Sequence, residues 1–198
     1  MPPAAMSSGT AKAQARTLPG DMAIWFFILA ELLVFGVFFL AYAFARARHV
    51  ALFDHYQQTL DRTSGAINTL VLITSSWCVV NAVAAIRRDR ADLCTRWLLA
   101  AIGGGAVFVV LKLHEFAEKA AAGITLSTNT FYMFYLSLTF FHFMHVLMGM
   151  VILAFVAAKA RRGGYDAGNH TGVETGASYW HMVDLVWIVL FPLVYVMH

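Results

Sequence analysis

The sequence predicts an all-α integral membrane protein built as a bundle of five transmembrane helices. Three properties of the 198 residues predict this fold class: 60% are hydrophobic, 13% are charged, and the mean hydropathy is +0.68. A water-soluble domain carries about a quarter charged residues. With half that density, the chain lacks the polar surface of a soluble enzyme, and its composition is not that of a disordered or fibrous protein.

The first twenty residues differ in composition from the rest of the chain. They are rich in Ala, Ser, Pro and Gly, carry Lys12 and Arg16, and lack the apolar core of a signal peptide. We expect residues 1–20 to form a mobile cytoplasmic tail and residues 21–198 to form the transmembrane domain.

Five stretches are apolar enough to cross a bilayer, which takes roughly 20 helical residues. They are residues 22–45, 66–86, 95–113, 131–158 and 178–197. The third is the shortest, and its uncharged part, residues 97–111, is shorter than a full span. Arg96 and Lys112, at the two ends of that part, are therefore expected to snorkel outward. Residues 103–105, three glycines, predict close approach of a neighbouring helix. Pro192 predicts a kink in the fifth span.

The distribution of Lys and Arg predicts the orientation. With five spans, nine of these residues fall on the side of the N-terminus and five on the other side. The positive-inside rule then places the N-terminus in the cytoplasm and the C-terminus on the opposite face. Because the basic residues lie in short connectors, a nucleic-acid partner is not expected.

Ionisable residues within the spans are the candidate functional residues, because each is costly in a bilayer. Glu31 lies among apolar residues of the first span, either as a proton-handling acid or as a neutral acid bonded to a neighbouring helix. Glu115 follows Lys112 by three residues and precedes Lys119 by four. We expect intrahelical pairs that form a solvated helix end, with Glu115 the member that faces inward.

Four histidines lie in or near the spans. His142 and His145 share a face of the fourth span, and His181 lies three residues before Asp184, close enough for a hydrogen bond. Together with His114, these histidines raise the hypothesis of a haem b site, which needs an axial ligand from each side. The other interpretation is that the histidines are packed side chains bonded across helix interfaces.

Taken together, the segments resemble subunit III of the haem-copper oxidase superfamily. The resemblance extends from Pro19 to Tyr195, and its most specific part is the W-H-x-V-D-x-V-W stretch that ends at Trp187. The other matching segments contain Ala30-Glu31, Asn68-Thr69, Ser75-Ser76, Lys112 to Glu115, and His142 to Val146. Five spans instead of seven resemble the shorter quinol-oxidase forms and the subunit-III-like proteins associated with nitric oxide reductase, and the segment from Asn169 to Asp184 looks closest to the second group.

The resemblance implies an accessory subunit that is not catalytic alone. It implies no metal or haem of its own, bound phospholipid, and a haem-bearing catalytic partner from an oxidase or a nitric oxide reductase, in a bacterial inner membrane. By position, Glu31 matches the family's intramembrane glutamate and His145 one of its motif histidines. Two alternatives stay open, a small haem b electron carrier and a proton-coupled transporter centred on Glu31.

Overall fold

The computed structural model describes residues 22–197, which contain helices and no β-strand. The predicted tail, residues 1–20, lies outside this range. The elements are α1 (Met22–Arg48), α2 (Val50–Gln57), α3 (Arg62–Ile86), α4 (Ala91–Ala121), α5 (Thr130–Arg161), α6 (Thr171–Phe191) and the π-helical turn η1 (Pro192–Val196). Five helices are long and apolar enough to cross a membrane, counting α6 and η1 as one, so the predicted fold class is confirmed.

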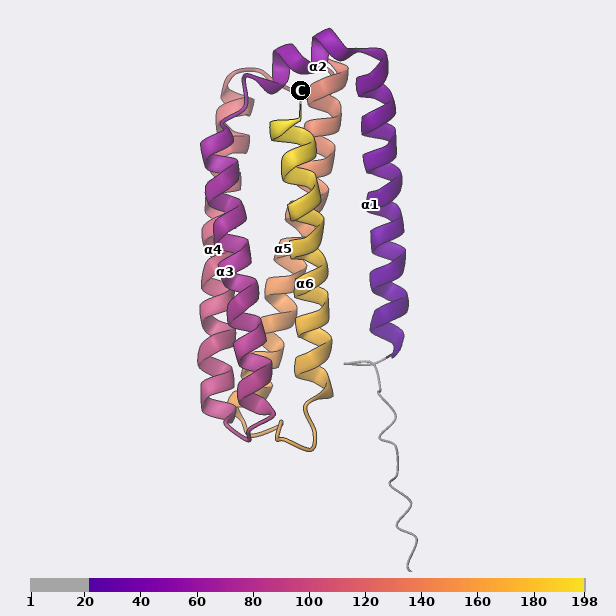
Figure 1. Cartoon of the computed structure of the whole chain (residues 1–198). Helices are drawn as coiled ribbons and strands as arrows, with labels where there is room; N and C mark the ends of the chain where they lie inside the picture. Colours follow the sequence, from indigo (N-terminus) through magenta and orange to yellow (C-terminus); the bar gives the residue numbers. More distant parts are fainter. Residues whose placement is uncertain (1–21, 198) are drawn as a thin grey trace, which may run out of the picture.

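The five long helices run up and down as a bundle, and α2 lies across the end where α1 stops (Figure 1). Helices α3 and α4 lie side by side, and α1 stands at the other edge, against α5 and α6. The first and last described residues are at opposite ends of the bundle, as an odd number of spans requires. Which end faces the cytoplasm remains a prediction from the charges.

Local sequence signals set several helix ends. The Asp61 carboxylate accepts the backbone N–H groups of Thr63 and Ser64 at 2.9 and 3.2 Å, which caps α3. Asn129 caps α5 in the same way through the N–H of Tyr132 at 2.9 Å. Gly123 and Gly163 follow the ends of α4 and α5 with φ near +70°, a conformation that glycine adopts without strain.

The helices extend beyond most of the predicted spans. Helix α4 continues to Ala121 rather than ending near residue 113, and α6 begins at Thr171 rather than at residue 178. The first two turns of α6 are not strongly apolar, but Val173 and Gly176 are buried there. Short α2 was not predicted, because its pattern mixes Phe53 with Asp54 and His55. Pro192 opens the π-helical turn η1, consistent with the expected break.

Small residues let the bundle close around a buried tryptophan. A Cβ atom on Gly105 of α4 or on Gly149 of α5 would lie 2.8 Å from the Trp180 ring of α6. A Cβ on Gly104 would lie 2.9 Å from the Cβ of Ser75 on α3, whereas a Cβ on Gly103 would meet nothing within 4 Å. The glycine triplet therefore allows close approach, as predicted, through its second and third members.

Candidate functional site

Glu31 and His145 meet inside the bundle, although 114 residues separate them in the chain. The Nε2 atom of His145 on α5 lies 3.0 Å from Oε2 of Glu31 on α1. Its Nδ1 atom lies 2.8 Å from the carbonyl oxygen of Phe141, which can only accept, so Nδ1 carries a proton and donates. The contact between Nε2 and the carboxyl group needs one further proton, so this pair holds a shared proton between two helices.

Lys112 and Glu115 form the centre of a buried polar cluster. Lys112 Nζ lies 2.7 Å from Glu115 Oε2 and 2.5 Å from the Tyr195 hydroxyl oxygen. The Glu115 carboxylate also accepts hydrogen bonds from Tyr195, at 2.8 Å, and from Tyr135. The cluster joins α4, α5 and η1, and its two charges neutralise each other.

This geometry corrects two expectations. Lys112 is 0% exposed, so it does not snorkel outward, and its pair with Glu115 is not a solvated helix end. The reason is the length of α4, which continues past Glu115 and keeps the pair inside the bundle. The solvated pair on this helix is His114 with Glu118, whose side chains are exposed and 3.3 Å apart. For Glu115, the expectation that it faces inward agrees with the structure.

His142 lies among aromatic rings in the centre of the bundle. The centroid of its ring is 5.1 Å from that of Trp187, 5.7 Å from Phe108 and 6.4 Å from Phe35. Neither ring nitrogen has a hydrogen-bond partner among residues 22–197. Phe35 also packs on His145, at 5.2 Å, so both histidines contact one ring, as expected for residues that share a face of α5.

His181 bonds to another helix rather than along its own. Its Nδ1 atom lies 2.6 Å from Ser76 Oγ on α3. The predicted hydrogen bond to Asp184 is not among the contacts of the described residues, and Asp184 is buried with its Oδ1 atom unpaired within that range. The structure therefore gives His181 a partner that intrahelical spacing could not indicate.

The four histidines of the haem hypothesis do not converge on one site. His114 is exposed, His142 lies between Trp187 and Phe108 in the centre of the bundle, His145 bonds to α1, and His181 bonds to α3. Within residues 22–197, no group of three or more His, Cys, Asp or Glu side chains is arranged to hold a metal ion. Glu31, His145, His181 and the Lys112–Glu115 pair instead bond to side chains of other helices.

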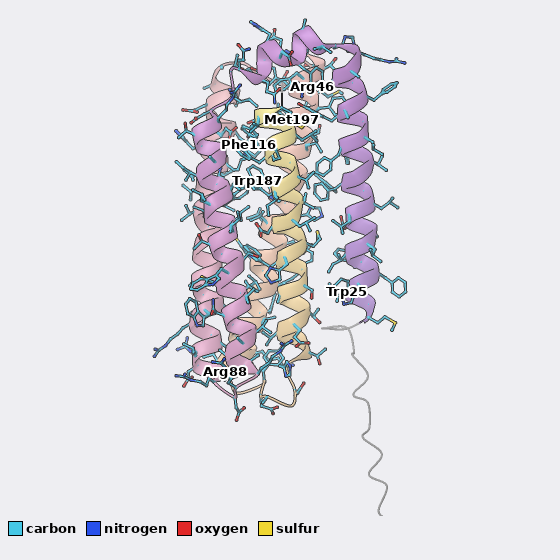
Figure 2. The ribbon with its side chains drawn as sticks, viewed as in Figure 1. Trp25, Arg46, Arg88, Phe116, Trp187 and Met197 are labelled. Carbon is cyan, nitrogen blue, oxygen red and sulfur yellow. The ribbon has the colours of Figure 1, made fainter. Side chains whose placement is uncertain are left out.

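Several partners in these contacts were not predicted from the sequence: Lys112 as an interior residue, and Tyr135, Tyr195 and Ser76 as hydrogen-bond partners. For the first, a lysine three residues before a glutamate fits a solvated helix end as well as an interior pair, so the spacing does not distinguish the two. The tyrosines carry no local signal, since they reach Glu115 from 20 and 80 residues away. Trp187, next to the cluster, lies in the half of the bundle that holds α2 (Figure 2).

Comparison with known protein families agrees with the resemblance to subunit III. The family model described as cytochrome c oxidase subunit III matches residues 10–198. The chain belongs to the cytochrome c oxidase subunit III family. The resemblance that the sequence motifs indicate is therefore confirmed, and the chain is a multi-pass membrane protein of this family.

Individual members of the family are similar over most of their length. Cytochrome c oxidase subunit 3 of Thermostichus vulcanus is 34% identical over 172 residues, which is 86% of this chain and 84% of that protein. Cytochrome c oxidase subunit 3 of Synechocystis is 33% identical and is covered over 72% of its length. A probable quinol oxidase subunit 3 of Staphylococcus aureus is 26% identical, with 96% of each chain covered.

Proposed function

We propose that the chain is a non-catalytic accessory subunit of a haem-copper oxidase, packed against the haem-bearing catalytic subunit in a bacterial inner membrane. The observation that carries this proposal is the family match over residues 10–198. The geometry supports it, because Glu31 bonds to His145, His181 to Ser76, and the Lys112–Glu115 pair to Tyr195 and Tyr135, each across a helix interface. A catalytic subunit of this class needs histidines for haem and metal.

The proposal assigns two supporting roles. The first is proton uptake, supported by the shared proton between Glu31 and His145. The second is phospholipid binding, supported by an apolar groove of about 640 Å³ at α1, α4 and α5. Phe38, Phe116, Phe140 and Phe141 line this groove, and Lys119 supplies a positive charge beside it for an anionic headgroup.

The terminal acceptor we propose is oxygen, since the relatives described above are named as subunits of cytochrome c oxidase or quinol oxidase. A nitric oxide reductase is the second candidate partner. The observation that favours it is the resemblance of the segment from Asn169 to Asp184 to the subunit-III-like proteins associated with that enzyme.

The haem carrier and transporter hypotheses make different predictions for the isolated chain. A haem b carrier shows a Soret band that His142→Ala abolishes. A proton-coupled transporter moves protons in liposomes that contain this chain alone, and Glu31→Gln removes the flux. Under the accessory proposal, the chain alone is colourless and gives no flux.

The test of an accessory role compares cells that have or lack this chain. We expect the haem-bearing subunit purified from cells without it to retain its haem content and its initial turnover, with less assembled complex or faster loss of activity during turnover. If that subunit keeps its haem content but shows no turnover until this chain is added back, the chain is part of the catalytic machinery and the proposal is wrong.

A further inference from the structure

The outer faces of the bundle differ in chemistry at membrane depth. On residues 26–44 of α1, 97–113 of α4 and 131–158 of α5, every exposed side chain is apolar or absent, as at glycine, and the half-buried polar side chains there are Ser137 and the mutually bonded Glu31 and His145. Such faces suit acyl chains, which offer no hydrogen bonds. The outer surface between α3 and α6 is different, because polar groups and small side chains lie there together.

A groove of about 250 Å³ separates α3 from α6 on this surface. Three small side chains line it, those of Ala84 on α3 and of Ala177 and Ser178 on α6. Small residues let another helix backbone approach closely, which is how helices associate in lipid. At the end of the groove nearest the helix ends, Arg87 and Glu174 form a salt bridge of 2.6 Å.

His181 supplies an independent reason for a protein partner. It lines the groove ten residues into α6, about 15 Å along the helix from its start. Ser76 holds its Nδ1 atom at 2.6 Å, and no hydrogen bond to Nε2 is found among the described residues. Lipid is a poor neighbour for the half-buried imidazole nitrogen of His181 and for the Ser178 hydroxyl, because an acyl chain can make no hydrogen bond to either group.

A second groove lies on the other side of the exposed ridge of α3. Thr74, Ser75 and Gly104 contribute to its lining, between α3 and α4. The exposed side chains of α3 thus form a ridge with a groove on either side, the shape into which the ridges of another helix pack.

From this placement, we infer that the groove between α3 and α6 receives a transmembrane helix of the haem-bearing catalytic subunit, which presents a hydrogen-bonding side chain to His181. The inference rests on the proposed function and adds to it the face of contact. A second copy of this chain could present a polar group to His181 only from its own α3 and α6 surface, since its α1, α4 and α5 faces offer none among their exposed residues.

Photo-crosslinking from matched positions tests the contact face. Val80 on the rim of the groove and Val151 on the outer face of α5 are each 52% exposed. A benzophenone amino acid at either site therefore disturbs the packing of the bundle to the same extent. Each variant is irradiated in membranes and purified by a tag on this chain. We expect the Val80 variant to crosslink to the haem-bearing subunit and the Val151 variant to crosslink to lipid.

Three results overturn the inference while the proposed function stands. They are crosslinking of the catalytic subunit from Val151 and not from Val80, crosslinking of Val80 to a second copy of this chain, and crosslinking of Val80 to lipid only. In each case the catalytic subunit still copurifies without irradiation. If it does not copurify from unirradiated membranes, the proposed function fails and the inference fails with it.

A bulky substitution gives a second, independent test. Ala84 in the groove and Ala106 on the outer face of α4 are both exposed, so tryptophan at either position does not disturb the core. We expect Ala84→Trp to retain about tenfold less catalytic subunit per chain than Ala106→Trp, with equal thermal midpoints for the two isolated chains. Equal retention by the two variants would overturn the inference.

Discussion

Glu31 and His145 form a polar link, 3.0 Å long, between α1 and α5. Around it the contact is aromatic, with ring centroids 5.1 Å apart for Phe35 and Phe141 and 6.1 Å apart for Phe27 and Tyr179. The link fixes how α1 sits on α5, because a carboxyl group and an imidazole in a bilayer must find each other or remain unpaired.

Substitutions at Glu31 separate a structural from a proton-handling role. In Glu31→Gln, the amide still bonds to His145, so we expect the free energy of unfolding to change by less than about 1 kcal/mol. Glu31→Ala leaves His145 Nε2 unpaired and should cost about 1–3 kcal/mol. Thermal unfolding in detergent measures both. Severe and equal loss of turnover in the two variants, with assembly intact, would show that the proton itself is needed.

Removing one charge of the Lys112–Glu115 pair should destabilise the bundle strongly. Lys112→Met leaves a buried carboxylate without its cation, at a cost of about 3–5 kcal/mol. Adding Glu115→Gln removes the second charge while keeping an acceptor for the tyrosine hydroxyls, so the double variant should recover most of the loss. A double-mutant cycle on unfolding free energies measures this coupling.

The exposed pair of His114 and Glu118 is the control for this cycle. Because water solvates both side chains, Glu118→Gln should change stability by less than about 1 kcal/mol. An effect of Lys112→Met as small as that of Glu118→Gln would contradict the description of Lys112 as a buried, paired charge.

Two neighbouring glycines should respond to alanine in opposite directions. At Gly105, a Cβ would lie 2.8 Å from the buried Trp180 ring and 3.0 Å from Met150, and such overpacking costs about 1–3 kcal/mol. At Gly103 nothing lies within 4 Å, so alanine should stabilise the helix by roughly 0.5–1 kcal/mol. Thermal midpoints of the two variants test the packing, and a rise at Gly105 would refute it.

Thr69 and Thr74 provide a matched pair on α3. Thr69 Oγ1 accepts the indole N–H of buried Trp187 at 3.0 Å, whereas Thr74 is exposed and bonds to the backbone carbonyl of Leu70. Thr69→Val should cost about 1–3 kcal/mol and shift the tryptophan fluorescence, because the indole loses its acceptor. Thr74→Val should do neither. Equal behaviour of the two variants would argue against the Trp187 contact.

Hydropathy alone predicted the five spans, since the bilayer requires every backbone group of a lipid-exposed segment to be paired within a helix. The same rule marked Glu31, His142, His145, His181, Asp184 and Glu115 as residues in need of partners. It did not name those partners. Glu31 and His145 lie on different helices, and so do His181 and Ser76, so only the packing of the helices brings them together.

Lys112 shows why the remaining part of the candidate site could not be predicted. A lysine near the end of a weak apolar stretch fits either a snorkelling residue or an interior one, and local spacing is identical in the two cases. The choice depends on how far α4 continues and on Tyr135 and Tyr195, which come from distant parts of the chain. The burial of Lys112 is thus a property of the bundle rather than of its own helix.

The most direct test of the accessory role is purification of the tagged chain in mild detergent, with an optical spectrum and mass identification of the proteins that accompany it. We predict a colourless chain together with a separate haem-bearing catalytic subunit, whose identity distinguishes oxygen from nitric oxide as the acceptor. A chain that carries a Soret band by itself, or that purifies without any haem-bearing partner from cells that make such a complex, would contradict the account.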